Sequence, residues 1–452
     1  MSEYPLTKAI PQGGGQRIAI IGGGWAGMAA AVSAVEAGHA VTVWEAARTW
    51  GGRARALPLR LPDGSEVAAD NGQHILIGAY SECLRLMAQI GLDIDTVLLR
   101  LPLQLQFPGG HGIRFPDWPA PLDALFGMVT ARGWHLRDKL ALIRTAVGWR
   151  LRNFDCPADW SVAHLCRELT PRVMAELVAP LCVSALNTPP EASSAQVFLR
   201  VMRDAMFGTR QGSNLLLPRT DLSTLFPGTA AHWLAQRGAQ LHLGERVLQL
   251  AHDGHHWQVD AAAFDQVVIA TAAPDAIRLL QTSVPMAPTP EADALQRWID
   301  LAAGLEHAAI TTVYAWAADA ALASPMLALR SGTQGNQTLP AQFVFDRAQL
   351  GGPPGLLAFV ISASTGERER LQSQVLAQAQ AQLGLQLQPV RTVVEKRATI
   401  ACHPALVRPP MRIASGLLAC GDYVDGPYPS TLEGAVRSGI ATMGAMRAVT
   451  TA

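Results

Sequence analysis

The sequence is poor in charge, and lysine is nearly absent from it. Charged residues make up 16% of the 452 residues, and only Lys8, Lys139 and Lys396 are lysines. Acidic and basic residues balance at 36 each. No overall positive field is present to attract nucleic acid, so we expect no nucleic-acid partner.

Cysteine pairs and long apolar runs are also missing. The six cysteines are scattered without a C-x-x-C pair, which argues against a metal site or a disulfide framework and favours free thiols in a reducing cytoplasm. No run of about eighteen apolar residues occurs, so a membrane span is not expected. Residues 1–16 lack the apolar segment of a secretory signal, and we expect a flexible leader there.

The stretch that follows the leader has the pattern of a dinucleotide-binding unit. A short apolar run, Arg17–Ile21, precedes Gly22, Gly24 and Gly27, which are spaced as G-x-G-x-x-G. The first glycine permits a tight turn, the second lets a phosphate approach the backbone, and the third lets a helix pack on the strand. Free N–H groups at the start of that helix can bind a pyrophosphate. Glu45 ends the next strand, where a carboxylate accepts ribose hydroxyls and repels a 2′-phosphate, which leaves NAD or FAD.

A second anion-binding pattern follows at once. Arg48, Gly51, Gly52 and Arg53 form R-x-x-G-G-R, in which the small residues admit an anion and the arginines neutralise it. A NAD dehydrogenase has no need of this second clamp. No further G-x-G-x-x-G follows a strand, and Gly351–Gly355, with its two prolines, is typical of a turn. The chain shows no nicotinamide domain of its own, so we expect an external electron donor.

A third pattern stands near the C-terminus. An apolar strand is expected to end at Gly421 and Asp422, and a helix is expected to start near Ser430 and Thr431. The N-terminus of that helix, if it faces the pyrimidine end of a flavin, would stabilise negative charge on the reduced ring.

These three patterns together resemble the FAD-dependent amine oxidase and phytoene desaturase superfamily, and the resemblance covers nearly the whole chain. It implies FAD as the cofactor, with Glu45 at the ribose, Arg53 near the pyrophosphate and flavin, and Asp422 beside the ribityl–phosphate link. The full set of residues expected at the cofactor is Gly22, Gly24, Trp25, Ala26, Gly27, Glu45, Ala46, Arg48, Gly51, Gly52, Arg53, Gln73, His74, Val247, Gly421, Asp422, Thr431 and Leu432.

The stretch before the last helix separates the chain from the amine oxidases of that superfamily. Those enzymes usually carry an aromatic residue there, whereas Thr431 occupies the matching position in this sequence. The stretch Asp425–Thr431 also offers no cysteine for attachment to a flavin. An amine oxidase is therefore disfavoured.

Four longer stretches resemble the squalene-associated FAD-dependent desaturase group; they are Asp70–Tyr80, Pro180–Ala195, Glu395–Pro409 and Gly421–Gly439. This resemblance implies a lipophilic isoprenoid substrate and the reduction of hydroxysqualene to squalene by reduced FAD, in squalene and hopanoid synthesis. Two alternatives stay open: a carotenoid-type desaturase with the opposite electron flow, and a non-catalytic flavin-binding partner of a terpenoid complex.

Removing an allylic hydroxyl requires a proton donor, an apolar wall and hydride from the reduced flavin. The candidate proton donors are His74, His403, Asp425 and Tyr428. Each has a structural alternative: His74 as a satisfied histidine beside FAD, His403 as a packing histidine, and Asp425 and Tyr428 as residues that shape their loop.

We predict an α/β fold in which a Rossmann-like FAD-binding domain carries an inserted mixed α/β substrate domain and a helical membrane-facing part. The FAD-binding domain is expected to comprise 17–80, 238–282 and 398–452, and the substrate domain 81–237 and 283–397. Helical patterns fill 81–150 and 160–210, strand-like runs occur within 305–365, and Ser373–Pro389 is expected to be helical.

Residues 119–153 have the composition of a helix that lies on a membrane. This segment contains six basic and two acidic residues, which gives it a local charge of +4. Basic amphipathic helices with tryptophan bind anionic membrane surfaces, so we expect a cytoplasmic protein held peripherally on the inner face of the cytoplasmic membrane. The alternative is an ordinary solvated helix pair packed on the core. The interleaved apolar residues are Leu122, Leu125, Phe126, Val129, Trp134, Leu140, Ile143 and Trp149.

Overall fold

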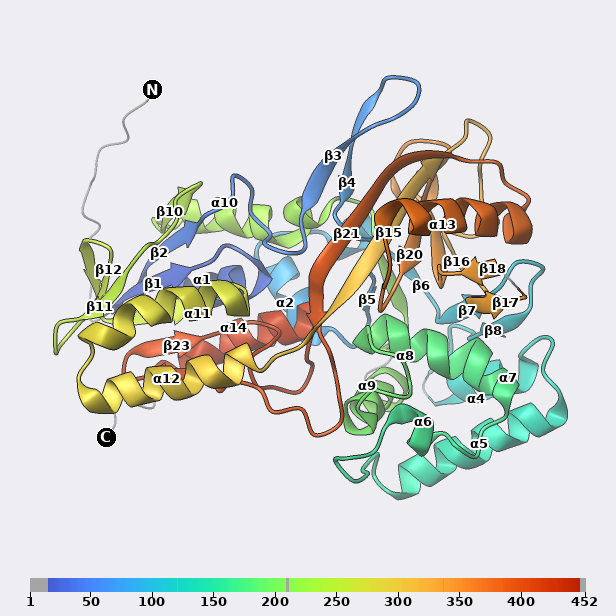
Figure 1. Ribbon diagram of the computed structural model, residues 1–452, viewed down its shortest axis with the longest axis horizontal. Coiled ribbons are helices and arrows are strands. Elements are labelled where there is room, and N and C mark those ends of the chain that lie inside the picture. Colours follow the sequence, from blue (N-terminus) through green and yellow to red (C-terminus); the bar gives the residue numbers. More distant parts are fainter. Residues whose placement is uncertain (1–14, 120, 209–210, 336, 448–452) are drawn as a thin grey trace.

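The computed structural model of the chain describes residues 15–119, 121–208, 211–335 and 337–447, so most of the expected leader lies outside the described residues. Figure 1 shows two lobes. One is built on a six-stranded sheet, and the other combines a five-stranded sheet with a group of short helices. The long strands β15 and β21 run along the junction between the lobes.

The six-stranded sheet has the order β10-β2-β1-β14-β23-β22, and every neighbouring pair is parallel except the edge pair with β22. In β1, Ile18 and Ile20 pack on one face while Ala19 and Ile21 pack on the other. Both faces are thus buried, which explains the continuous apolar run in the sequence. The strands are β1 (Arg17–Ile21), β2 (Ala40–Glu45), β10 (Gln240–Leu243), β14 (Gln266–Ile269), β22 (Arg412–Ala414) and β23 (Leu417–Ala419).

Helices cover both faces of this sheet. One face packs against α1 (Trp25–Glu36), α2 (Ser81–Gln89), α10 (Thr229–Ala235) and α14 (Leu432–Arg447). The other packs against α11 (Ala273–Ser283), α12 (Thr289–Ala303) and the small sheet of β11 (Leu250–His252), β12 (Trp257–Val259) and β13 (Ala262–Phe264). Helices α2, α10 and α12 come from ranges that the sequence assigned to the substrate domain. The predicted domain boundaries would therefore separate these three helices from the sheet on which they pack.

The five-stranded sheet is antiparallel, with the order β16-β19-β20-β15-β21. Its strands are β15 (His307–Trp316), β16 (Met326–Ala328), β19 (Phe343–Asp346), β20 (Leu356–Ile361) and β21 (Gln388–Ile400). One face packs on α13 (Arg368–Leu383) through Leu371, Val375 and Ala379. The strand-like runs within 305–365 are thus confirmed. The Ala/Gln-rich helix is confirmed over residues 373–383, but it ends at Gly384 in the left-handed conformation, and residues 388–389 begin β21.

The other face of this sheet covers the helical part of the second lobe. That part contains α4 (Leu122–Thr130), α5 (Leu136–Leu151), α6 (Val162–Leu165), α7 (Pro171–Val173), α8 (Ala179–Leu186) and α9 (Ala195–Phe207), whereas the short α3 (Ile94–Val97) packs beside α2 in the first lobe. The remaining strands are β3 (Ala56–Arg60), β4 (Glu66–Asp70), β5 (Leu76–Ile77), β6 (Leu98–Leu101), β7 (Gln104–Gln106), β8 (Gly112–Arg114), β9 (Leu215–Pro218), β17 (Gly332–Gln334) and β18 (Gln337–Leu339).

The prediction of helix throughout 81–150 was wrong between residues 98 and 114. Here β7 and β8 form an antiparallel pair, and β6 pairs with β9 from a distant part of the chain. A turn with Gly109 and Gly110 at positive φ joins β7 to β8, a conformation that glycine adopts without strain. Among the described residues, none of the helices is both long and apolar enough to cross a membrane.

Candidate active site

The first glycine motif forms the turn from β1 into α1, and its glycines face different neighbours. Gly22 has φ 118°, and a Cβ there would stand 2.7 Å from the Ala270 carbonyl oxygen. At Gly27 a Cβ would stand 1.9 Å from the Gly22 carbonyl oxygen, so Gly27 provides the close packing of helix on strand. A Cβ at Gly24 would meet nothing nearer than 3.8 Å, so the backbone there stays open to an approaching ligand.

Glu45 ends β2 beside this turn. One carboxylate oxygen accepts a hydrogen bond of 2.8 Å from the Gly23 N–H, and the other accepts one of 2.8 Å from the Ala47 N–H. The carboxylate is thus held by the backbone at the position where the sequence predicted a ribose contact. Its remaining lone pairs can accept the ribose hydroxyls.

Arg53 carries the second motif. Its guanidinium forms an ion pair with Asp422 and donates to the Ala398 carbonyl oxygen at 2.9 Å. Burial alone lowers the pKa of Arg53, but the Asp422 carboxylate outweighs it and the net shift of the pKa is upward. Arg48 is exposed and does not line the cavity that contains Arg53. Of the two arginines in the motif, only Arg53 is therefore placed to neutralise a bound anion. Arg55, which the sequence analysis missed, lines that cavity instead.

Asp422 and the start of α14 complete the polar region. The Ser430 N–H donates to the Asp422 carbonyl oxygen at 3.1 Å, which holds the loop between them. The Thr431 hydroxyl oxygen accepts from the Gly434 N–H at 2.9 Å, so Thr431 caps α14. The predicted helix start near Ser430 and Thr431 is confirmed, since α14 begins at Leu432.

A buried carboxylate that the sequence analysis missed fixes this helix start. Glu433 accepts from the backbone N–H groups of Glu82 (3.1 Å) and Cys83 (2.9 Å) at the beginning of α2, and from Arg437 Nε at 2.7 Å. A carboxylate is favourable at a helix N-terminus because it meets unpaired N–H groups. Glu433 therefore joins α2 to α14 and sets the position of Thr431.

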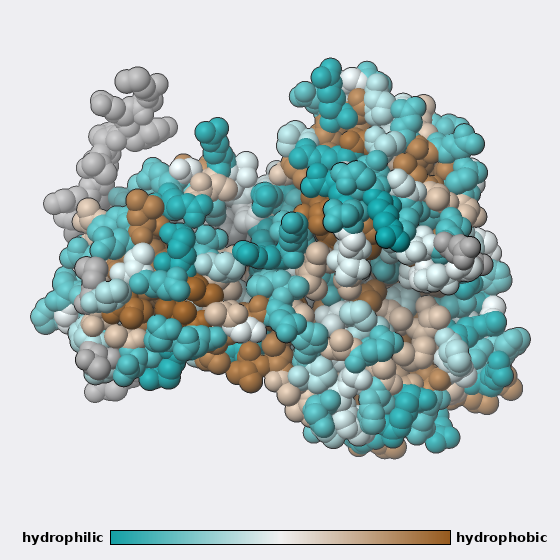
Figure 2. Space-filling view, viewed as in Figure 1, coloured by the Kyte–Doolittle hydropathy of each residue, from teal (hydrophilic) through white to brown (hydrophobic). Residues whose placement is uncertain are grey.

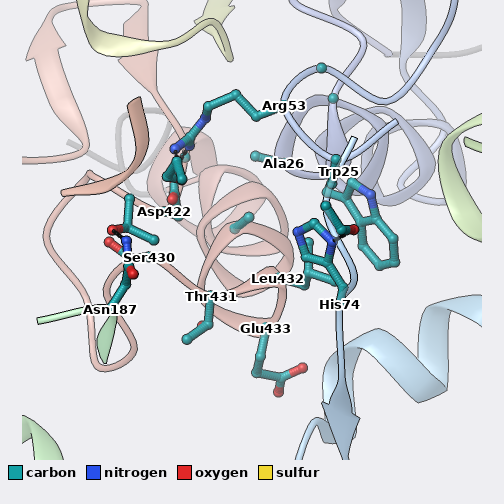
Figure 3. A pocket seen from close by; sticks show the side chains of 18 of the residues that line it. Trp25, Ala26, Arg53, His74, Asn187, Asp422, Ser430, Thr431, Leu432 and Glu433 are labelled. Carbon is teal, nitrogen blue, oxygen red and sulfur yellow. Dashed lines mark hydrogen bonds and ion pairs between the residues drawn. The ribbon is translucent and has the colours of Figure 1, made fainter. Parts of the chain in front are cut away.

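The cofactor groups described above line one cavity of about 640 Å³. Figure 3 shows Arg53 meeting Asp422 on one side and His74 with Trp25 on the other, with Thr431 and Leu432 on the last helix between them. The residues from the cofactor prediction that line it are Gly22, Gly24, Trp25, Ala26, Glu45, Ala46, Gly51, Gly52, Arg53, Gln73, His74, Val247, Gly421, Asp422, Thr431 and Leu432.

The polar end of this cavity fits FAD. No described side chain caps the N-terminus of α1, whose first N–H groups remain available for a pyrophosphate. Glu45, held by backbone N–H groups, lies beside that helix start, and Arg53 lies in the same cavity. A carboxylate for ribose, N–H groups for the pyrophosphate and a helix N-terminus at Thr431 for the flavin ring are thus present together.

The opposite end of the cavity is largely apolar. Most of its wall comes from α8, α9 and the five-stranded sheet, with Leu103 and Leu215 from neighbouring segments, and Ser184, Asn187, Ser213 and Ser362 are polar residues beside them. The apolar residues of this arm are Leu103, Leu181, Val183, Ala185, Val201, Met202, Ala205, Met206, Leu215, Ile310, Phe343, Phe345 and Val360.

Of the four candidate acids, His74 and Tyr428 line the cavity. The His74 Nδ1 lies 2.7 Å from the Gly72 carbonyl oxygen, which can only accept, so Nδ1 is the donor. Burial, together with the charge of Arg53, lowers the pKa of His74. The imidazole is therefore neutral with Nε2 as an acceptor, which fits a positioning group better than an acid.

Tyr428 meets a carboxylate that the sequence analysis did not single out. Its hydroxyl donates to Asp204 Oδ2 at 2.6 Å, and both residues line the cavity. Burial and the Asp204 carboxylate raise the pKa of Tyr428 to about 12, so the phenol keeps its proton at neutral pH. Arg203 Nε donates to the other Asp204 oxygen at 2.8 Å.

His403 and Asp425 do not line the cavity, which corrects their place among the candidates. His403 Nδ1 lies 3.1 Å from the Ala192 carbonyl oxygen, and its Nε2 lies 3.4 Å from the Glu306 carboxylate. The Asp425 side chain is 73% exposed and pairs with Arg408. Their side chains bind these partners outside the cavity.

Comparisons with known proteins agree with this geometry. The family model described as flavin containing amine oxidoreductase matches residues 25–444. A hydroxysqualene dehydroxylase from Rhodopseudomonas palustris is 27% identical, over 93% of this chain and 96% of its own. A zeta-carotene desaturase from Synechocystis is 39% identical but matches only 28% of this chain and 25% of its own.

Solved structures share the fold. An oxidoreductase from Methanosarcina mazei superimposes with a TM-score of 0.69 at 16% identity, covering 95% of this chain and 100% of its own. Because one family model spans most of the chain, including the glycine motif's helix and the C-terminal helix, the protein belongs to the flavin containing amine oxidoreductase family and is an FAD-dependent oxidoreductase.

Proposed function

We propose that the protein reduces hydroxysqualene to squalene, with the allylic hydroxyl leaving as water, in squalene and hopanoid synthesis. The observation that carries the proposal is a single cavity whose polar end fits FAD and whose other end is apolar. An apolar arm accepts a long hydrocarbon by removing its surface from water. The relatives named hydroxysqualene dehydroxylase support the choice because they match this chain almost from end to end.

Different residues of the cavity would bind the dinucleotide, the flavin ring and the substrate. The first turn of α1, Glu45 and Arg53 would hold the dinucleotide, and the start of α14 would face the flavin ring. When bound and reduced, FAD supplies a hydride. The apolar arm excludes water from the allylic carbon, so that water does not compete for the cation left by the departing hydroxyl.

The chain must also deliver a proton to the hydroxyl, because hydroxide is a poor leaving group. We propose Tyr428 as the donor, with Asp204 as the residue that positions it. The phenol keeps its proton at neutral pH because its pKa is about 12, and it gives that proton to the substrate hydroxyl as water leaves. Asp204, held by Arg203, fixes the direction of the phenol, and a proton from solvent restores the phenol afterwards.

We also propose that an anionic membrane surface supplies the substrate. Nine large apolar side chains between residues 118 and 151 are exposed: Trp118, Leu122, Leu125, Phe126, Val129, Leu136, Leu140, Val147 and Leu151. In Figure 2, brown atoms lie along the lower right edge of the molecule, where Figure 1 places α5. Apolar side chains interleaved with arginine favour a peripheral position on the inner face of the cytoplasmic membrane. The electrons would come from an external donor.

The direction of electron flow tests the proposed reaction. Photoreduced protein is mixed with hydroxysqualene without oxygen, and the products are extracted and identified. We expect squalene, with the flavin oxidised in equal amount, and we expect deuterium carried by the reduced flavin to appear in squalene.

The carotenoid-type desaturase is the second candidate, favoured by the partial likeness to zeta-carotene desaturases. It predicts the reverse: oxidised protein bleaches as a hydrocarbon gains double bonds. Bleaching on a carotenoid precursor, with hydroxysqualene left untouched by reduced protein, would overturn the dehydroxylase.

A further inference from the structure

A second cavity, of about 490 Å³, lies outside the FAD and substrate cavity. It forms where the beginning of α4, the end of α5 and the end of α9 meet, in the helical part of the second lobe (Figure 1). Pro121 precedes α4, Arg150 stands in the last turn of α5, and Arg203 and Phe207 belong to α9. Nothing in the proposed reaction uses this cavity.

The charge of this second cavity is positive. Its described lining contains Arg150 and Arg203 and no acidic residue. Arg150 lies 5.7 Å above the Phe207 ring and, among the described residues, forms no ion pair. Arg203 uses its Nε for Asp204, and its terminal nitrogens have no partner in the described part of the chain. Two guanidinium groups from different helices thus present free N–H donors, the arrangement that binds phosphate.

Apart from Asn153, the rest of the described lining is apolar or glycine. The rings of Phe154 and Phe207 lie 5.1 Å apart, and Pro119 and Pro121 also line the cavity. Leu151, which follows Arg150, is 83% exposed. A free phosphate gains nothing from such walls, whereas a lipid can place its phosphate at the arginines and its glycerol and chains against the rings.

We propose that this cavity binds the phosphodiester of an anionic glycerophospholipid. The inference rests on the membrane contact proposed above and adds a defined site to it. Helix α9 separates the two cavities, because Met202 and Met206 line the substrate arm while Arg203 and Phe207 line the lipid cavity. A lipid held there places the bilayer one helix away from the apolar arm.

The test uses the full chain loaded with FAD and two single variants of α5. Arg150→Gln removes one arginine of the cavity and leaves the Arg203–Asp204 pair intact. Arg137→Gln removes the same charge from an 80% exposed position on the same helix, outside the cavity. Native mass spectrometry and titration with a short-chain phosphatidylglycerol, which stays soluble, measure binding without any vesicle.

We expect wild type and Arg137→Gln to retain one short-chain phosphatidylglycerol, and Arg150→Gln to bind it about tenfold more weakly. Short-chain phosphatidylcholine should bind more weakly than phosphatidylglycerol, and inorganic phosphate should compete poorly. Equal affinity in both variants, or competition by inorganic phosphate as strong as by the lipid, would overturn the lipid site.

A vesicle arm separates this inference from the membrane contact itself. Flotation of wild type with phosphatidylglycerol vesicles reports the contact made by the whole face. Absence of flotation would overturn the membrane contact. If wild type floats but Arg150→Gln and Arg137→Gln bind short-chain phosphatidylglycerol with equal affinity, only the defined lipid site is overturned.

Discussion

Asp204 stands next to Arg203 on α9, in a stretch whose neighbours Val201, Met202 and Ala205 line the apolar arm. A carboxylate in such a wall needs partners, because burying it without hydrogen bonds is costly. Arg203 and Tyr428 supply them. The Tyr428 hydroxyl therefore has a fixed direction inside a cavity that is largely apolar at this end.

We predict that Tyr428→Phe, which removes the proton donor, lowers kcat about a hundredfold or more, and that Asp204→Asn, which removes the carboxylate that positions it, lowers kcat less. FAD binding, followed by the flavin absorption spectrum, should stay unchanged. In wild type the rate should fall as pH rises toward about 12, where Tyr428 loses its proton, and Asp204→Asn should move that fall to lower pH because the carboxylate raises the pKa of Tyr428. His403→Gln, outside the cavity, serves as the control and should keep wild-type kcat; full activity of Tyr428→Phe would remove the pair from the mechanism.

Among the elements, α1 and α14 pack unusually closely. A Cβ at Gly439 of α14 would stand 2.2 Å from the Ala26 carbonyl oxygen and 2.9 Å from the Ala30 nitrogen. The alanine-rich sequence of α1 thus reflects contact with a second helix as well as helix propensity. Because the two helices pack at this contact, the start of α14 lies close to the glycine turn that precedes α1.

We predict that Gly439→Ala lowers the free energy of unfolding by about 1–3 kcal/mol, because backbone atoms must move to admit the methyl group. Gly444→Ala, on the same helix, meets nothing within 4 Å and should be neutral or stabilising by up to about 1 kcal/mol. Denaturant titration of both variants measures the difference. Equal stability of the two would contradict the close packing.

Helices α4 and α5 expose most of the apolar residues expected at a membrane, but not the tryptophans. Trp134 and Trp149 are buried in the core, and the Trp134 indole donates to Glu176 at 2.9 Å. The expected residues that are exposed are Leu122, Leu125, Phe126, Val129 and Leu140. A surface contact through 119–153 remains a proposal, made with these side chains and without the two tryptophans.

We predict that changing Arg132, Arg137 and Arg144 to Glu weakens binding to anionic vesicles, since each basic residue near such a surface contributes about 1 kcal/mol. The same three charge reversals at Arg297, Arg368 and Arg370, on α12 and α13, form the control. Flotation at low salt measures both sets. An equal effect of the two sets would show that net charge, and not this face, governs binding.

At the scale of the whole molecule, distant segments are joined around the cofactor cavity. Arg53 and Asp422 form an ion pair across 369 residues of sequence. Asn187, at φ 46°, donates to the Thr399 hydroxyl at 2.9 Å and accepts from the Ala363 N–H at 2.6 Å, which ties α8 to the five-stranded sheet. A ligand in this cavity therefore contacts both lobes.

We predict that removing FAD lowers Tm and that adding it back raises Tm with concentration, because a ligand that binds only the folded state adds RT ln(1 + [L]/Kd), about 2.7 kcal/mol at a hundredfold excess over Kd. NAD at the same concentrations should leave Tm unchanged. Thermal unfolding of the stripped protein with each nucleotide measures this. A shift with NAD and none with FAD would contradict the assignment of the cofactor.

Local pattern was sufficient for the dinucleotide turn. The glycine spacing, the apolar strand before it and Glu45 after it lie within thirty or so residues, and backbone geometry over that range depends mainly on neighbouring residues. For the same reason the start of α14 could be predicted, since Thr431 caps a helix with its own side chain.

Which polar side chains reach the cavity depends on contacts between segments that are far apart in sequence. Tyr428 and Asp204 meet across 224 residues, and no local pattern records such a contact. Arg48 is exposed, while Arg53, five positions later, is half-buried and pairs with Asp422. Trp134 and Trp149 turn inward because packing against other helices selects the face of α5 and of the segment before it. The cofactor-binding units thus follow from local sequence. The composition of the active site follows from long-range packing, since side-chain direction depends on neighbours that are distant in sequence.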